Sequence, residues 1–196
     1  PTIRVIYEVG VPSIIMQSIS SVMTYFPNLI LVGFTATAVT VLGVYFKLQS
    51  FIFMPIFGLN NGIIPIIAYN YGAQNKKRIK SSINLGIIIS IAIMFLGVLL
   101  FQLFPARLLK FFDASEHMLE IGVPALRIIS LCFIPAGYSI LVGSVFQALG
   151  KGTYSLMISV ARQLLVILPV AFLFAKIFGL HMVWWALPIA EIVSFS

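Results

Sequence analysis

The feature that most constrains this sequence is the length of its uncharged stretches. No Asp, Glu, Lys or Arg occurs in the 38 residues from Val9 to Phe46, and none occurs from Ser81 to Ala106. An α-helix needs about 20 apolar residues to cross the roughly 30 Å hydrocarbon core of a bilayer. Each stretch is therefore long enough for a membrane-spanning helix, and the first is too long for only one.

The chain divides into six such segments, so the predicted fold is all-α, a polytopic membrane protein with six transmembrane helices. The predicted spans are 9–33, 38–71, 82–104, 119–148, 153–177 and 182–196. A membrane β-barrel is the alternative, but its strands alternate in hydrophobicity, whereas residues 85–95 do not. The last segment is too short to span a bilayer and the chain opens without Met. We therefore expect the chain to be a piece of a longer polypeptide.

Composition excludes several other classes of protein. Of the 196 residues, 61% are hydrophobic and 9% are charged, and the mean hydropathy is +1.11. Soluble domains are about 25% charged, because polar groups must cover much of their surface. A soluble enzyme, a disordered or fibrous chain and a secreted disulfide-rich domain are therefore excluded. Cys132 is the single cysteine and is expected to be a packing residue.

Basic residues are distributed unequally between the two sides of the predicted bundle. One side holds Arg4, Lys76, Lys77, Arg78, Lys80 and Lys151, and the other holds Arg107, Lys110 and Lys176. Cytoplasmic loops are enriched in Lys and Arg, so the loop Lys76–Arg78 is predicted to be cytoplasmic. The net charge of +7 is then explained by the orientation of the chain in the bilayer. It does not indicate nucleic-acid binding, and no nucleic-acid partner is expected. The same loop could also contact anionic lipid headgroups.

The sequence has none of the short motifs that indicate catalysis or metal binding. HExxH, GxGxxG, a Walker lysine and paired Cys and His residues are all absent, and His117 and His181 lie far apart in outer loops. We predict a protein that is not an enzyme, with no cofactor, no catalytic residue and no metal site. An ATP-driven pump would need nucleotide-binding machinery from another chain.

Polar residues recur along one face of the first predicted span. Ser13, Gln17, Ser21, Thr24 and Asn28 are spaced three or four residues apart, which places them on one side of a helix. Lipid cannot satisfy such groups, so this face must meet another helix or water. Interhelical hydrogen bonding is one interpretation. The other is that Gln17, Ser21, Thr24 and Asn28 line a substrate cavity, since five polar residues exceed what one helix contact needs.

The second predicted span combines polar side chains with residues that interrupt helices. Its candidate cavity residues are Gln49, Asn60 and Asn61, and its candidate hinge residues are Pro55, Gly58, Gly62 and Pro65. Proline removes a hydrogen bond from a helix, so we expect this span to be long and bent. Interrupted helices often border transporter sites, and a simple structural kink is the alternative.

Three further residues inside the predicted spans are candidates for function. Placing the charge of Arg162, in the fifth span, within the bilayer costs free energy unless the side chain faces the protein interior or reaches the surface. Arg162 is therefore either a structural residue or a substrate contact. Tyr138 in the fourth span is a candidate cavity residue. Glu191 is the only carboxylate well inside an apolar segment. It is a candidate for ion coupling, and a structural partner for a basic group is the alternative.

Several longer runs together carry a family resemblance. They are Val9–Ser13, Phe53–Gly62, Ala68–Ala73, Phe146–Gly152 and Trp184–Glu191. In order and spacing the chain resembles the second half of a multidrug and toxic compound extrusion (MATE) transporter, over essentially its whole length. The stretch from Pro55 to Ala73 is the most specific part of the resemblance.

The resemblance implies a two-lobed, 12-helix transporter in which this chain is the carboxy-terminal six-helix lobe and the amino-terminal lobe is missing. It also implies a multi-pass protein of a bacterial plasma membrane, the cell inner membrane. Such transporters export cationic or amphipathic compounds in exchange for H⁺ or Na⁺ by alternating access. The implied partners are therefore small-molecule substrates, the lipid bilayer and the missing lobe.

The absence of certain acidic residues narrows the resemblance to one branch of the family. In one branch, carboxylates in the first and fourth helices of this lobe help to bind the coupling cation. Here the first span offers only Ser, Thr, Asn and Gln, and the fourth has no acid beyond Glu120. Gln147 stands where many relatives have arginine. The chain therefore resembles the DinF-like branch, whose key carboxylate lies in the amino-terminal lobe, and no cation site is transferred to this lobe.

Two alternatives to a drug antiporter remain open from the sequence. A lipid-linked oligosaccharide flippase of the same broad superfamily would show a strongly cationic cavity, whereas the basic residues inside these spans are Lys47, Arg127 and Arg162. A non-transporting membrane scaffold would have no reason for polar faces on several helices. Measurement of gradient-dependent export separates these alternatives.

Overall fold

The structure is a computed structural model that describes residue 7 and residues 10–11, 14–15, 18–19, 21, 25–26, 28–33, 35–161, 166–179 and 183–195. These residues form helices and the turns between them, which confirms the all-α class. The helices are α2 (Ala36–Gly72), α3 (Lys76–Leu103), α4 (Pro105–Lys110), α5 (Glu116–Ser130), α6 (Phe133–Ala148), α7 (Gly152–Val160), α8 (Leu168–Phe178) and α10 (Ala186–Phe195). Before α2, the described residues between Tyr7 and Val32 are also helical.

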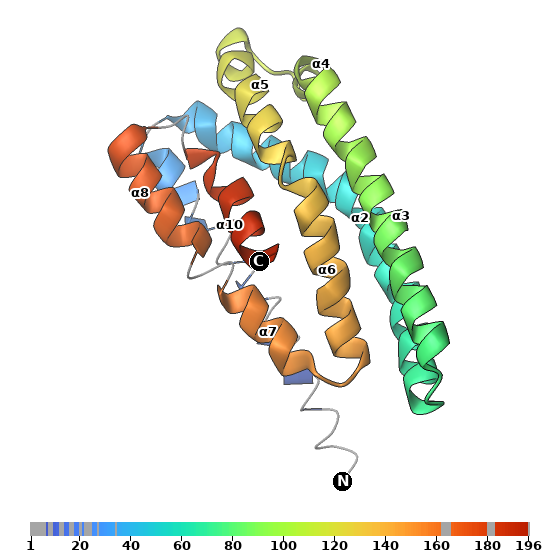
Figure 1. Cartoon of the computed structure of the whole chain (residues 1–196). Coiled ribbons are helices and arrows are strands. Elements are labelled where there is room, and N and C mark those ends of the chain that lie inside the picture. Colours follow the sequence, from blue (N-terminus) through green and yellow to red (C-terminus); the bar gives the residue numbers. More distant parts are fainter. Residues whose placement is uncertain are drawn as a thin grey trace.

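The best-packed part of the molecule is the seam between α2, α3 and α6. Figure 1 shows α3 running beside the second half of α2, with α6 next to both, and each pair of these helices is in contact. The buried residues of α3 recur every three or four positions, as expected for one helix face: Gly86, Ser90, Met94, Gly97 and Phe101. Because lipid is as apolar as these side chains, close packing rather than hydrophobicity holds the seam together.

Glycines allow the three helices to approach closely. A Cβ atom added at Gly97 would lie 2.6 Å from the Cγ2 atom of Ile52, and one at Gly86 would lie 2.5 Å from the Cδ1 atom of Ile63. At Gly137 of α6 an added Cβ atom would lie 2.6 Å from the Cγ atom of Met94. Small residues at these positions therefore set the distance between α3 and its two neighbours.

A buried hydrogen bond also crosses the seam. The hydroxyl group of Ser90 on α3 donates to the backbone carbonyl oxygen of Gly137 on α6 at 3.0 Å, and Ser90 is fully buried. This bond fixes α3 relative to α6, because neither group has access to water or lipid.

Replacing Ser90 with alanine is expected to lower the apparent free energy of unfolding by about 1 kcal/mol, the usual net contribution of such a bond. Ser50→Ala is the matched control. The Ser50 hydroxyl is exposed and donates to the carbonyl of Phe46 in its own helix at 2.8 Å, so its removal should leave stability unchanged. Thermal unfolding of the complete polypeptide in detergent measures both, and equal stabilities for the two variants would contradict a role for the Ser90 bond.

Helix α2 is long and changes direction, as the sequence predicts. It contains Pro55 and Pro65 yet remains one helix from Ala36 to Gly72. In Figure 1 its first part crosses behind α5 and its second part descends beside α3, so the axis bends between them. Each proline leaves a carbonyl without its helical hydrogen-bond partner, which makes a bend at this place inexpensive.

The predicted fourth span, 119–148, is divided into two helices. Helices α5 and α6 meet at Leu131 and Cys132 with a bend of 47°. Pro135 explains where α5 stops, because a proline ring clashes with the carbonyl group four residues earlier, here that of Leu131. The break therefore lies between Arg127 and Pro135.

The predicted fifth and sixth spans correspond to shorter helices. The fifth contains α7 and α8, and residues 162–165 between them lie outside the described part of the chain. Pro169 stands in the first turn of α8, where its missing N–H group costs no hydrogen bond. The described part of the sixth segment has α10 beginning at Ala186. By length and apolar character, α2 and α3 each qualify as membrane spans, and α5 with α6 qualifies as a third, bent span.

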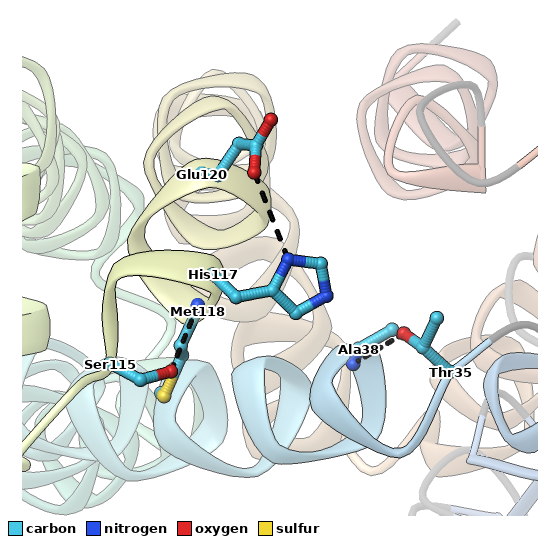
Figure 2. Close-up of polar contacts among 6 residues, drawn as sticks. All are labelled: Thr35, Ala38, Ser115, His117, Met118 and Glu120. Carbon is cyan, nitrogen blue, oxygen red and sulfur yellow. Dashed lines mark hydrogen bonds and ion pairs between the residues drawn. The ribbon is translucent and has the colours of Figure 1, made fainter.

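Side-chain caps mark the beginnings of α2 and α5. The hydroxyl group of Thr35 accepts a hydrogen bond from the backbone N–H of Ala38 at 3.1 Å and begins α2. The hydroxyl group of Ser115 does the same for Met118 at 3.3 Å and begins α5. Figure 2 shows both caps. The short helix α4, which periodicity does not predict, begins at Pro105 directly after α3.

Candidate functional site

The candidate cavity residues of the first span are only partly covered by the structure. Gln17 and Thr24 lie outside the described residues. Ser21 is exposed and Asn28 is half-buried, and Asn28 interacts with another residue of the chain. The exposure of Ser21 agrees with a face open to a cavity, although lipid contact would give the same exposure.

The three candidates on α2 occupy different environments. Gln49 is half-buried and Asn61 is exposed, whereas Asn60 is only 5% exposed. Asn60 lies on the buried face that also holds Ile56 and Ile63, so it belongs to the seam rather than to an open surface. Within the described part of the chain its Oδ1 atom has no hydrogen-bond partner. Burying an amide oxygen without a hydrogen bond costs free energy of folding. Asn60 therefore lowers the stability of this seam.

The candidate hinge residues lie where α2 could change its bend. Apart from their chain neighbours and the backbone of α2, no described residue has an atom within 4 Å of the position that a Cβ atom would occupy at Gly58 or Gly62. They are thus free of the packing that fixes Gly86, Gly97 and Gly137. Flanked by Pro55 and Pro65, this part of α2 has both weakened hydrogen bonding and open space around its small residues.

The remaining cavity candidates lie on the fourth and fifth predicted spans. Tyr138 of α6 is half-buried and interacts with another residue. Arg162 lies outside the described residues. Tyr138 follows Gly137 directly, so it stands beside the place where α6 packs most closely on α3.

Glu191 is a buried carboxylate, as its apolar surroundings in the sequence suggest. It is 9% exposed and lies on α10, which packs against α5, α6 and α8. It interacts electrostatically with Tyr45 of α2, and Cys132 at the break between α5 and α6 also acts on Tyr45. Ionisable side chains from three elements distant in sequence therefore lie around Tyr45.

Sequence reasoning did not single out Tyr45. It lies in an apolar run and repeats no motif, and only the packing of α10 against the bundle shows its relation to Glu191. Tyr45 is 1% exposed and belongs to the main hydrophobic cluster of the lobe. Its position four residues before Gln49 is the one signal that could have found it, because both lie on the same side of α2.

Three charged or ionisable side chains near α4 and the start of α5 make contacts at the surface: Lys47, His117 and Glu120. The ammonium group of Lys47 lies 5.9 Å from the centre of the Phe112 ring, at the end of α4. His117 and Glu120 on α5 form an exposed pair at 3.7 Å, drawn in Figure 2. Among the residues described, no group of three or more His, Cys, Asp or Glu side chains lies close enough to hold a metal ion.

Comparison with known proteins identifies the family. A family model described as MatE matches residues 12–193. The chain belongs to the MATE family. The match spans all six predicted segments, including α2 and its prolines, and the resemblance drawn from the sequence is confirmed.

Curated relatives include multidrug export proteins from staphylococci. The chain is 31% identical over 189 residues to the multidrug export protein MepA of Staphylococcus haemolyticus, and that alignment covers 96% of this chain and 41% of the relative. MepA of Staphylococcus aureus strain MRSA252 is 30% identical, with 95% and 41% covered. The chain thus spans less than half the length of these MATE relatives.

Solved structures give the same result. The MATE multidrug transporter DinF-BH, solved as a complex, is 33% identical with a TM-score of 0.87, over 98% of this chain and 44% of that one. A MATE transporter in the straight conformation superposes with a TM-score of 0.92 at 21% identity, covering 98% and 44%, which shows the shared fold. This chain is therefore one lobe of a MATE-type multi-pass membrane protein.

Proposed function

We propose that the chain is the carboxy-terminal lobe of a secondary-active antiporter that exports cationic or amphipathic drugs in exchange for H⁺ or Na⁺. The observation that supports this most is the match of nearly the whole chain to MATE proteins, including the multidrug transporter DinF-BH at 33% identity. The missing amino-terminal lobe would complete the transporter in a bacterial plasma membrane.

The substrate path in this proposal runs along the polar face of the first span and α2. Gln17, Ser21, Thr24, Asn28, Gln49, Asn61, Tyr138 and Arg162 would line it. Asn60 would contribute from the seam, where its unpaired Oδ1 atom is ready to accept a hydrogen bond once α2 changes its bend. The lining is mainly uncharged, so it can bind molecules of varied shape through polar and aromatic contacts.

Alternating access in this proposal comes from the bend of α2. The seam of α2, α3 and α6 moves as one packed body, because its glycines and the Ser90 bond fix it. Pro55, Gly58, Gly62 and Pro65 absorb the change of direction as one lobe rocks against the other. An ion gradient drives the cycle, and Glu191 is the residue of this lobe that would respond to the ion.

Efflux from cells tests the proposal. Cells that express the complete polypeptide should accumulate less of a cationic dye than cells with the empty vector. A protonophore, or removal of the Na⁺ gradient, should abolish the difference, because antiport stops when its driving gradient is lost. Equal accumulation with and without the protein, at confirmed membrane expression, would contradict the proposal.

A further inference from the structure

The N-terminal end of α3, which follows the short turn from α2, presents a dense positive surface. Lys76, Lys77, Arg78 and Lys80 are all exposed, and they lie within five consecutive positions. No acidic residue occurs anywhere in α2, this turn or α3 to offset them. These four basic residues are called the basic turn below.

The basic turn lies at the N-terminus of α3, where positively charged side chains destabilise a helix. The N-terminus of a helix carries a partial positive charge and favours acidic side chains. The first turn of α3 contains three basic residues and no acidic one. The helix dipole and the side chains therefore repel one another, and both attract an anion.

The backbone holds the basic turn in a defined shape. Gln74 adopts a left-handed conformation with φ of 56°, and the N–H group of Asn75 donates to the carbonyl of Asn70 at 2.9 Å. The side chain of Asn75 accepts a hydrogen bond from the N–H of Arg78 at 3.1 Å and caps α3. The charges are thus presented by the start of a capped helix that follows a closed turn, and not by a long loop.

Apolar and aromatic side chains surround the basic turn on the helices below it. Tyr69 and Tyr71 are exposed in the last turn of α2, and Ile66 and Leu85 are exposed one to two turns further into the bilayer. Tyrosine is favoured at the level of lipid headgroups, and apolar side chains are favoured beside acyl chains. The basic residues are followed by tyrosines and then by apolar side chains, which matches a ligand with an anionic head and an apolar tail. A soluble anion would contact only the basic residues.

We infer that the basic turn binds the phosphate group of an anionic phospholipid of the cytoplasmic leaflet. The phosphate lies at the N-terminus of α3 between Lys76, Lys77 and Arg78, and the acyl chains lie against the exposed apolar faces of α2 and α3. This binding is separate from drug transport and does not depend on the proposed antiport.

Native mass spectrometry of the purified complete polypeptide with added phosphatidylglycerol or phosphatidylcholine tests the inference. The wild-type protein should bind phosphatidylglycerol about tenfold more tightly, because each basic residue near the headgroups contributes to attraction for anionic lipid. The variant K76Q/K77Q should lose most of this preference and retain Arg78 and Lys80 for membrane orientation. Lys151→Gln is the control, since Lys151 lies in another cytoplasmic turn with its ammonium group 6.0 Å from the centre of the Tyr154 ring.

Three outcomes would overturn the inference. One is an equal affinity of the wild-type protein for both lipids. Another is an unchanged preference in K76Q/K77Q. The third is displacement of phosphatidylglycerol by inorganic phosphate, which would identify a soluble-anion site. Salt dependence of the wild-type protein provides a readout that needs no variant, since the preference should fall as ionic strength screens the charges.

Discussion

Replacing Gly97 with alanine is expected to lower the apparent free energy of unfolding by about 2 kcal/mol, the typical cost of overpacking a close-packed interior. The new methyl group would lie 2.6 Å from the Cγ2 atom of Ile52 and 3.2 Å from the Phe133 ring. Ile52 cannot turn that methyl away easily, because its β-branched side chain is restricted at χ1. Phe133 is fully buried and has no space to move. Gly97→Leu should abolish the folded protein in detergent.

Gly43→Ala is the matched control for this experiment. Gly43 also lies inside a helix, but outside its own helix backbone and chain neighbours no atom of the described residues stands within 4 Å of its Cβ position. Alanine there should be neutral or stabilise the protein by about 0.5–1 kcal/mol, because it restricts the unfolded chain. Thermal unfolding of the complete polypeptide measures both variants. Similar unfolding temperatures for Gly97→Ala and Gly43→Ala would show that the seam is less tightly packed than described.

Replacing Glu191 with glutamine is expected to reduce gradient-driven transport by about tenfold or more, because an ionisable group buried within a membrane-spanning bundle usually serves ion movement. Glutamine keeps the size and hydrogen-bonding capacity of the side chain but cannot exchange a proton. The change therefore removes an ionisable group and leaves the packing of α10 nearly intact. Dye efflux at equal membrane expression measures the effect.

Glu120→Gln is the control for Glu191. The Glu120 side chain is 81% exposed and interacts with His117 at 3.7 Å, and exposed pairs contribute little to stability. Its replacement should leave transport unchanged. Equal transport by the Glu191→Gln variant and the wild-type protein would exclude ion coupling through this residue and leave Glu191 with a structural role.

The sequence predicts the helices better than it predicts their breaks. Long uncharged runs identify α2 and α3 because a bilayer sets the length of a spanning helix. Proline has two different outcomes here: α2 continues through Pro55 and Pro65, whereas α5 ends shortly before Pro135. A proline only removes a hydrogen bond locally, and the neighbouring helices decide whether the chain bends or breaks, so sequence alone does not distinguish the outcomes.

The candidate site is less predictable for a similar reason. Helical periodicity places polar residues on one face of a span, but it does not say whether that face meets a cavity or another helix. Asn60 and Asn61 are adjacent and chemically identical, yet one is buried in the seam and the other is exposed. Tyr45 gains its relation to Glu191 only through contacts between helices distant in sequence. Such information lies in the packing and not in any local pattern.

The most direct test of the account is transport by the purified complete polypeptide in proteoliposomes with one ion gradient imposed at a time. A cationic dye should move against its own concentration gradient while either a proton or a sodium gradient is present, without ATP, and movement should stop when an ionophore dissipates that gradient. Dye movement that continues after both gradients are dissipated, or no movement under either gradient, would contradict an antiporter built on this lobe.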